Sequence, residues 1–421
     1  MHTMPQLIKP VARPQILCVM VLPPNPEGHG GSQRAWRLVE ALQPYGDIHF
    51  VLIHDAEASV AIQTPLEPLS PFVASITRIK IDEWHGRKRK LLKVFHPKIA
   101  DFAKFGSFSA PHFSNRILKN IACQLKVRDV DLVFAGRITS AAIVQSLINQ
   151  KLITAKRKVV DFDDVLSKFR KRENEKTGSV QGFQGRLLGK LDTYLISREE
   201  SNIAQGWNGV SVCSDEDVSA LACQFKGLHV VKVPNVVSRD ALPVRFADSK
   251  FRCLFVGNLG FPPNVHGLME FMKYAWTESK RAMPELEFDI VGFNPSAEVT
   301  ALGDKEGVTV HANVPSLKGF YQNCDLVIVP ILYGSGTRVK IVEAMAYGRP
   351  VLSTNLGAEG LDLENGRQIL LVESIDDFPA ALKRIRQDRT LARSIADEAR
   401  TFQEQHFGPP AVAAAMLAFL Q

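Results

Sequence analysis

Short apolar runs alternate with helix-like segments along most of the chain, and this alternation constrains the fold more than any other feature of the sequence. One series of strand-length runs occupies 16–22, 49–53, 131–135, 158–162, 209–213 and 229–233. A second series occupies 252–257, 287–292, 307–311, 325–329, 350–354 and 368–372. Near-continuous apolar strands separated by helices are typical of parallel sheets that are covered on both faces. The sequence therefore predicts an α/β protein with two doubly wound sheets.

The chain is long enough for two such domains. Its 421 residues exceed what one ordinary core serves, because domains of about 100–200 residues are the norm. The polar, irregular stretch 237–250 is the predicted hinge, so 1–236 and 251–405 are the predicted Rossmann-like domains. A final helix at 409–421 is expected to pack back on the first domain. Two facing domains enclose a cleft, and ligands in open α/β sheets bind at the carboxyl ends of the strands.

The charge balance favours an anionic partner. The net charge is +7, and such a surface attracts nucleotides and acidic lipid headgroups. No apolar run approaches the roughly 20 residues that span a bilayer, and the proline-broken N-terminus does not resemble a signal peptide. The six cysteines are scattered without a CxxC pair, as in a reducing compartment. A cytoplasmic protein is therefore expected.

The segment 82–105 is basic and aromatic, with cations interleaved among apolar side chains. Such a segment lies either on an anionic membrane surface, here the inner face, or in solvent as a basic loop. The sequence carries no known nucleic-acid-binding module, so nucleic acid is not predicted as a partner.

The stretch 325–354 reads as a buried strand, a glycine-containing loop, a helix and a second strand. The glycines Gly334 and Gly336 let the backbone turn and approach a ligand, to which Ser335 and the N–H groups of Gly336 and Thr337 offer contacts. The free N–H groups of the helix start favour a phosphate. Arg338 and Lys340 add positive charge in the expected first turn. A plain strand–loop–helix connection with solvated cations is the alternative.

Glu343 follows in the same helix, where a carboxylate accepts hydrogen bonds from hydroxyl groups. An anionic, hydroxyl-bearing ligand such as a nucleotide sugar satisfies both the cations and this carboxylate.

The sequence of 252–373 resembles glycosyltransferase family 4, the glycosyl transferases group 1. It resembles in particular a sub-branch found in exopolysaccharide loci. The resemblance implies the GT-B fold, with two Rossmann-like domains facing each other across a cleft. It also implies that Glu343 binds the donor ribose. An earlier glutamate of the family pattern is replaced here by Ser335. An arginine and a lysine of the first donor-domain loop are replaced by Asn258 and by Asn264 or His266. We expect Arg338 and Lys340 to supply the missing charge.

The first domain contributes a second loop. Residues 23–34 resemble the family's glycine loop, which approaches the donor phosphates from across the cleft, and the matching positions are Gly30 and Gly31. The following helix is expected to use Ser32 as its N-cap. Arg137 stands where many family members carry a catalytic-region histidine, and it is a candidate cleft residue.

Three carboxylates follow the strand at 158–162, and they are predicted to face the cleft. Asp161 and Asp163 are candidates for orienting acceptor hydroxyls or for proton transfer. Asp164 belongs to the same cluster, or it simply caps the next helix. The Asp-x-Asp wording is similar to the metal motif of the other glycosyltransferase fold, which GT-B enzymes lack, so no metal is predicted.

The resemblance implies a metal-independent, retaining hexosyltransferase without a cofactor. It moves a sugar from a nucleotide-diphosphate sugar to a saccharide or lipid-linked acceptor, in the synthesis of cell-surface polysaccharide or glycoconjugate. Two other classes stay open. One is a GT-B sugar-nucleotide epimerase, which the carboxylate cluster allows. The other is a non-catalytic, membrane-associated partner with a degenerate donor site, which the departures at Ser335 and Asn258 allow.

Overall fold

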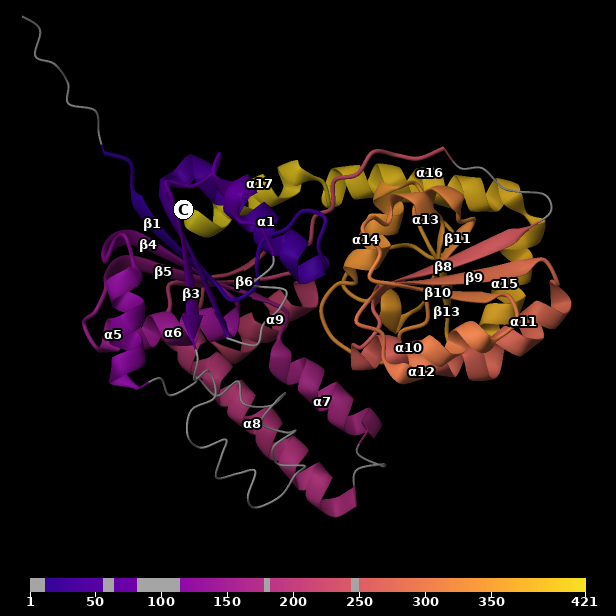
Figure 1. Ribbon diagram of the computed structural model, residues 1–421, viewed down its shortest axis with the longest axis horizontal. Coiled ribbons are helices and arrows are strands. Elements are labelled where there is room, and N and C mark those ends of the chain that lie inside the picture. The colour runs from indigo at the N-terminus through magenta and orange to yellow at the C-terminus, as the bar shows by residue number, and fades with distance from the viewer. Residues whose placement is uncertain (1–11, 56–63, 82–113, 178–181, 244–249) are drawn as a thin grey trace, which may run out of the picture.

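A computed structural model describes residues 12–55, 64–81, 114–177, 182–243 and 250–421. These residues form two lobes side by side, each built around one sheet (Figure 1). The predicted membrane-contacting segment 82–105 lies outside the described residues, as does 244–249 of the predicted hinge.

The N-terminal sheet has seven parallel strands in the order β3-β2-β1-β4-β5-β6-β7. The strands are β1 (Gln15–Met20), β2 (Asp47–Asp55), β3 (Ser75–Ile81), β4 (Asp129–Gly136), β5 (Thr154–Asp163), β6 (Gly209–Val212) and β7 (Val230–Lys232). The sequence prediction missed β3. This edge strand alternates Thr77, Arg78 and Lys80 with its apolar residues, so it lacks the continuous apolar run by which the inner strands were found.

Helices cover both faces of the N-terminal sheet. They are α1 (Gly30–Leu42), α5 (Asn115–Gln124), α6 (Arg137–Asn149), α7 (Leu166–Thr177), α8 (Gly182–Gly206) and α9 (Asp215–Gln224). Helix α1 shares a core with one face of β1, β2 and β4. Helices α5, α6, α8 and α9 pack on the opposite face. The near-continuous apolar sequence of the inner strands follows from this two-sided burial.

The C-terminal sheet has six parallel strands in the order β10-β9-β8-β11-β12-β13. The strands are β8 (Phe251–Asn258), β9 (Leu286–Phe293), β10 (Val308–Ala312), β11 (Leu326–Val329), β12 (Val351–Thr354) and β13 (Leu370–Val372). The helices are α10 (Pro262–Phe271), α11 (Thr277–Ala282), α12 (Ala297–Thr300), α13 (Lys318–Asn323), α14 (Val339–Ala346), α15 (Phe378–Gln387) and α16 (Arg389–His406). Two doubly wound parallel sheets confirm the predicted fold class.

The chain ends on the lobe where it began. Helix α17 (Pro409–Leu420) follows α16 and runs from the C-terminal lobe to α1, beside which the C-terminus lies (Figure 1). Its residues Val412, Met416 and Phe419 are buried in the same core as β1 and α1. The guanidinium of Arg157 in β5 donates to the carbonyl oxygens of Phe419 and Leu420, which fixes the last turn.

Buried polar side chains of the C-terminal lobe hold the connection between the lobes. Arg349, which is 0% exposed, donates from Nη2 to the carbonyls of Leu242 (2.7 Å) and Pro243 (2.8 Å). Gln403 of α16 donates to the carbonyl of Val237 (2.7 Å). The described part of the connection is therefore attached to the C-terminal lobe.

Within the described ranges, no helix is both long and apolar enough to cross a membrane.

Candidate functional site

Helix α1 begins at Gly30 and points its first turn toward the C-terminal lobe. Its N-cap residue is His29, whose side chain makes no capping hydrogen bond. The expected cap, Ser32, is instead the third residue of the helix, and its hydroxyl lies 3.1 Å from Nε2 of His29. That prediction was wrong because the helix starts two residues earlier, at the glycines. Burial, and then the charge of Arg137, lower the pKa of His29 to about 4, so the ring is neutral at physiological pH.

The start of α1 directly faces the start of α14. A Cβ atom on Gly30 would lie 2.9 Å from Cγ2 of Val339, the first residue of α14, so only glycine allows this approach. The ring of His29 also lies 5.7 Å from that of Phe293, at the end of β9. Two helix N-termini from different lobes thus meet at one point, and each carries partial positive charge. The arrangement suits an anion held between them.

Arg338 is the N-cap residue of α14 and therefore stands just before the first turn in which it was expected. Its Nη1 donates to the carbonyls of Gly336 (2.8 Å) and Ser335, so the side chain folds back over the glycine loop. Its Nη2 is buried and has no hydrogen-bond partner among the described residues. Burial lowers the pKa of this guanidinium, which nevertheless stays charged. An unsatisfied buried N–H donor at a helix start is a further feature that suits an anion.

Lys340, in the first turn of α14, reaches across to β8 and to the first turn of α10. Its Nζ donates to Oδ1 of Asn264 (2.8 Å) and lies 4.0 Å from the ring centre of Phe255. Burial, and then Arg338, lower the pKa of Lys340 well below its ordinary value. The side-chain oxygen of Asn258, the last residue of β8, accepts from the N–H of Gly260 (3.0 Å) and so shapes the turn that follows the strand.

Glu343 lies on the face of α14 that meets the N-terminal lobe, and it is 4% exposed. The hydroxyl of Tyr321, in α13, donates to one carboxylate oxygen (3.2 Å), and Arg239 of the connection donates to the other (3.3 Å). Gln33 of α1 also bonds to this carboxylate. Burial raises the pKa of Glu343, while Arg239 and the hydrogen bonds oppose the rise. Sequence reasoning missed Tyr321 and Arg239, because nothing local marks either as a partner of Glu343.

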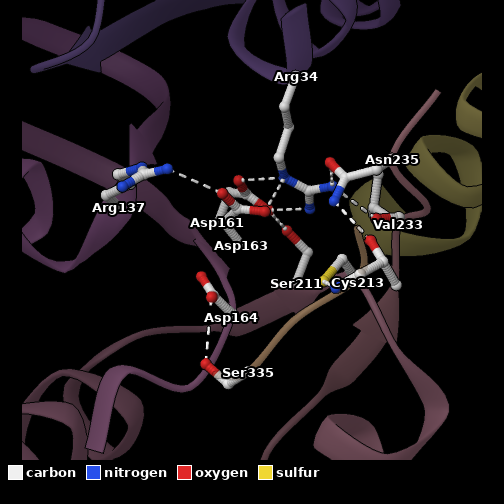
Figure 2. A network of polar contacts seen from close by, with 11 residues as sticks. Arg34, Arg137, Asp161, Asp163, Asp164, Ser211, Cys213, Val233, Asn235 and Ser335 are labelled. Atoms are coloured by element: carbon white, nitrogen blue, oxygen red, sulfur yellow. Dashed lines mark hydrogen bonds and ion pairs between the residues drawn. The ribbon is translucent and has the colours of Figure 1, made fainter. Parts of the chain in front are cut away.

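Asp161 does not face the cleft as predicted. It is 2% exposed, and Arg34 of α1 binds it with two hydrogen bonds, at 2.9 Å from Nε and 2.5 Å from Nη2 (Figure 2). The hydroxyl of Ser211, on β6, donates to the same carboxylate (2.7 Å). The side chains of a strand alternate between its two faces. The side chain of Asp161 lies on the face that α1 covers, where Arg34 binds its carboxylate.

Asp163 and Arg137 form an ion pair at 2.9 Å, in which the arginine is half-exposed and the carboxylate is mostly buried (Figure 2). Both residues have a positive φ, 67° and 70°, and the register between β5 and β6 shifts between Asp161 and Asp163. Left-handed backbone at non-glycine residues costs energy and is concentrated at functional sites. A Cβ atom on Gly31 would lie 2.8 Å from Nη2 of Arg137, so this pair borders the first turn of α1.

Asp164 reaches the opposite lobe. Its Oδ2 accepts a hydrogen bond from the hydroxyl of Ser335 (3.2 Å), in the loop before α14 (Figure 2). A Cβ atom on Gly336 would lie 2.9 Å from the same oxygen. Burial, and then the charge of Asp163, raise the pKa of Asp164 to about 6.

Other contacts hold the glycine loop against the N-terminal lobe. The side-chain amide of Asn235 donates to the hydroxyl of Thr337 (2.7 Å), and the N–H of Thr337 donates to the sulfur of Cys213 (3.4 Å). Arg172 of α7 donates to the carbonyl of Gly334 (2.8 Å) and forms a bidentate ion pair with Glu359 (2.5 and 2.7 Å). Each of these contacts joins residues more than 100 positions apart in the chain. No local sequence pattern could therefore have predicted the roles of Asn235, Cys213 and Arg172.

The structure thus brings most of the predicted site residues together around the two facing helix starts. Asn258 lies at the edge of this region, where it shapes a turn, and Asp161 lies beneath it. Across the described ranges, no group of three or more His, Cys, Asp and Glu side chains has the arrangement of a metal site.

Comparison with known proteins agrees with this architecture. Residues 250–388 match the family described as glycosyl transferases group 1. The fold is similar to that of sucrose-phosphate synthase from Thermosynechococcus elongatus, with a TM-score of 0.66 and 17% identity over 96% of this chain and 97% of that one. It is also similar to HepE from Anabaena, solved in complex with UDP and glucose, with a TM-score of 0.60 and 15% identity over 97% and 99% of the two chains.

Two curated relatives match over shorter lengths. An uncharacterized 44.6 kDa protein in the cps region of Klebsiella pneumoniae is 24% identical over 162 residues, which are 37% of this chain and 42% of that protein. The D-inositol 3-phosphate glycosyltransferase of an Arthrobacter strain is 30% identical over 134 residues, which are 30% of this chain and 31% of that enzyme. The matches thus cover less than half of each relative.

The protein therefore has the GT-B fold. Its C-terminal lobe matches the glycosyl transferases group 1 over residues 250–388, in agreement with the family that the sequence resembles.

Proposed function

We propose that the protein transfers a sugar from a nucleoside-diphosphate sugar to an acceptor hydroxyl, with retention of the anomeric configuration. The observation that carries the proposal is the close approach of two helix N-termini, α1 and α14, across the cleft at Gly30 and Val339. The diphosphate of the donor would lie there, between N–H groups contributed by both lobes.

Arg338 and Lys340 would supply the positive charge at the diphosphate. The unsatisfied Nη2 of Arg338 is a donor without a partner in the described chain, and a phosphate oxygen would satisfy it. Lys340 contacts Asn264, in the first turn of α10 and near the position where the family pattern has a lysine, so its ammonium stands near the place from which that charge is missing. The unsatisfied donor of Arg338 and the position of Lys340 support the expectation that these two cations replace the arginine and lysine of the family pattern.

Glu343 would bind the ribose. Its two carboxylate oxygens accept from Tyr321 and Arg239, and the two neighbouring hydroxyls of a ribose offer donors of the same kind. Tyr321 is fully buried and orients the carboxylate from behind. Arg239 belongs to the connection between the lobes. On donor binding, a ribose hydroxyl would replace Arg239 as the donor to this carboxylate oxygen.

During transfer, the bond between the anomeric carbon and the diphosphate oxygen breaks, and the diphosphate leaves with the electron pair. Arg338, Lys340 and the two helix starts would stabilise the negative charge that develops on this oxygen. The acceptor oxygen would bond to the anomeric carbon on the face that the diphosphate leaves, and its proton would pass to the departing phosphate. Such a route requires neither a protein nucleophile nor a metal ion.

The acceptor is proposed to be a saccharide or a lipid-linked saccharide used in cell-surface polysaccharide or glycoconjugate synthesis. The relative in the cps region of Klebsiella supports this assignment. An epimerase would need a pair of carboxylates beside the sugar. The structure pairs Asp161 and Asp163 with arginines, which leaves Asp164 as the single carboxylate of the cluster without an ion pair among the described residues.

The test is the binding of UDP, GDP, ADP and TDP without metal, measured by thermal shift on the wild type and two variants. Glu343→Ala removes the proposed ribose contact. Glu306→Ala removes a carboxylate whose side chain is 88% exposed on the same lobe, and it serves as the matched control. We expect one nucleotide to stabilise the wild type and Glu306→Ala, but not Glu343→Ala.

Stabilisation by none of the four would refute the proposed donor site and favour a non-catalytic partner. If binding is found, incubation with the corresponding nucleotide sugar in the absence of an acceptor separates the enzyme classes. Conversion to an epimeric nucleotide sugar would contradict transferase function.

A further inference from the structure

The three carboxylates at the end of β5 differ in their hydrogen-bond and ion-pair partners. Asp161 is bound by Arg34 and Ser211, and Asp163 pairs with Arg137. Within the described part of the chain, the carboxylate of Asp164 accepts one side-chain hydrogen bond, from Ser335, and forms no ion pair. Of the cluster, Asp164 therefore keeps the most capacity to accept hydrogen bonds from a ligand.

The position of Asp164 relates it to the proposed donor site. It touches Ser335 and Gly336, which stand four and three positions before the first residue of α14, where the diphosphate is proposed to bind. The sugar of a nucleotide sugar is attached directly to the second phosphate, so it must lie within one ring width of the helix start. Asp164 is the acidic side chain that the N-terminal lobe places against this stretch of the loop (Figure 2).

We propose that Asp164 binds a hydroxyl group of the sugar that is transferred, and thereby makes the site select a nucleotide sugar over the bare nucleotide. This assignment rests on the proposed function and deepens it. An ionised carboxylate accepts hydrogen bonds from hydroxyls and donates none, so it recognises a polyol and not an apolar group. The hydroxyl of Ser335 would give way to, or share the carboxylate with, the hydroxyl of the sugar.

The surroundings of Asp164 make this contact dependent on pH. The charged and titratable groups that face it from the adjacent strands, helices and loop are Asp163, Arg137, Arg338, Asp217, Glu200 and Cys213. Burial outweighs the two arginines and raises the pKa of Asp164 to about 6. Below that pH the carboxyl is protonated and becomes a poorer acceptor, so the preference for the sugar should fade.

The experiment compares the affinity for a nucleotide with that for its sugar conjugate, using calorimetry with UDP and UDP-glucose and with GDP and GDP-mannose. The variants are Asp164→Asn, Ser335→Ala and, as a control on an exposed carboxylate, Asp304→Asn. We expect Asp164→Asn to weaken binding of one nucleotide sugar about tenfold, as for a lost hydrogen bond to a charged group, while the affinity for the bare nucleotide changes less than about twofold. Asp304→Asn should match the wild type.

The preference of the wild type for the nucleotide sugar should also decrease as the pH falls through about 6, and that of Asp164→Asn should not change there. Equal weakening of both ligands by Asp164→Asn would overturn the proposal. It would also be overturned if Ser335→Ala reproduced the full effect, because Asp164 would then act only by holding Ser335. If the wild type binds none of the four ligands, the failure lies with the proposed donor site itself.

Discussion

Arg34 and Asp161 form a bidentate ion pair that is almost completely buried, with both side chains 3% exposed. The same guanidinium donates to the carbonyl of Val233 (2.8 Å) and to the side-chain oxygen of Asn235 (3.1 Å). Asn235 in turn donates to Thr337 of the glycine loop. The pair is therefore the base of a polar network that runs from β5 through the start of the connection to the opposite lobe (Figure 2).

Removing Arg34 should destabilise the protein strongly. In Arg34→Ala the carboxylate of Asp161 stays buried without its cation, which typically costs about 3–5 kcal/mol. Urea unfolding of the variant measures the loss. The matched control is Arg13→Ala, which breaks an exposed pair with Asp47 and should change the free energy of unfolding by less than about 1 kcal/mol. Equal losses in the two variants would contradict a structural role for the Arg34–Asp161 pair.

Gly30 should tolerate no side chain unless Val339 is shortened. In Gly30→Ala the new methyl group would lie 2.9 Å from Cγ2 of Val339, so the two helix starts must move apart. Because both would bind the diphosphate, we expect the affinity for the nucleotide to fall about tenfold, a loss of about 1.4 kcal/mol. The double variant Gly30→Ala/Val339→Ala should recover part of it, as measured by calorimetry, because it removes the contact with Cγ2 but keeps the Cβ atom of residue 339 at 3.1 Å. A double variant no better than the single one would argue against this contact as the cause.

Lys340 should take up a proton when a nucleotide diphosphate binds. Burial and the nearby Arg338 hold its pKa well below the ordinary value, and a bound anion would raise it. At a pH above the pKa that Lys340 has in the free protein, binding of the nucleotide should therefore consume protons. Calorimetry in buffers with different ionisation enthalpies measures this uptake, which should disappear in Lys340→Met. Uptake that persists in the variant would assign the proton to another group.

Asp164 should reduce the stability of the free protein at neutral pH. Its folded-state pKa of about 6 lies above the ordinary value, so folding favours the protonated form. The associated stability is fully present below about pH 4 and is lost as the pH rises through about 6. Asp164→Asn, which keeps an acceptor for Ser335, should therefore raise the melting temperature by about 2–5 °C at pH 7.5, and the gain should vanish near pH 4. A gain that is independent of pH would contradict this cause.

Regular patterns in the sequence predicted the C-terminal lobe well. Its inner strands are continuous apolar runs, and the loop from Tyr333 to Thr337 is followed by a helix with a compact apolar face, so strand, loop and helix were each visible locally. The edge strand β3 was missed because four of its seven residues are polar. The expected cap at Ser32 was misplaced because a glycine start carries no capping side chain.

The carboxylate cluster shows where local reasoning ends. Asp161, Asp163 and Asp164 look alike in the sequence, and proximity to a strand end predicted one shared environment. The structure gives each a different main partner, Arg34, Arg137 and Ser335, contributed by α1, α6 and the opposite lobe. Arg34 also lies 3.4 Å from the carboxylate of Asp163. Partners so distant in the chain are fixed only when the two lobes pack.

The sequence by itself determined the fold class, the family and the residue types at the donor loop, because apolar periodicity and loop composition are local properties. The tertiary structure decided which partner each charged side chain has. It buried Asp161 under Arg34, turned Lys340 toward Asn264, set Arg239 on Glu343 and placed Gly30 against Val339. These relations depend on the distances between elements and on the exclusion of water from the closed interface, and neither is encoded in any single stretch of the chain.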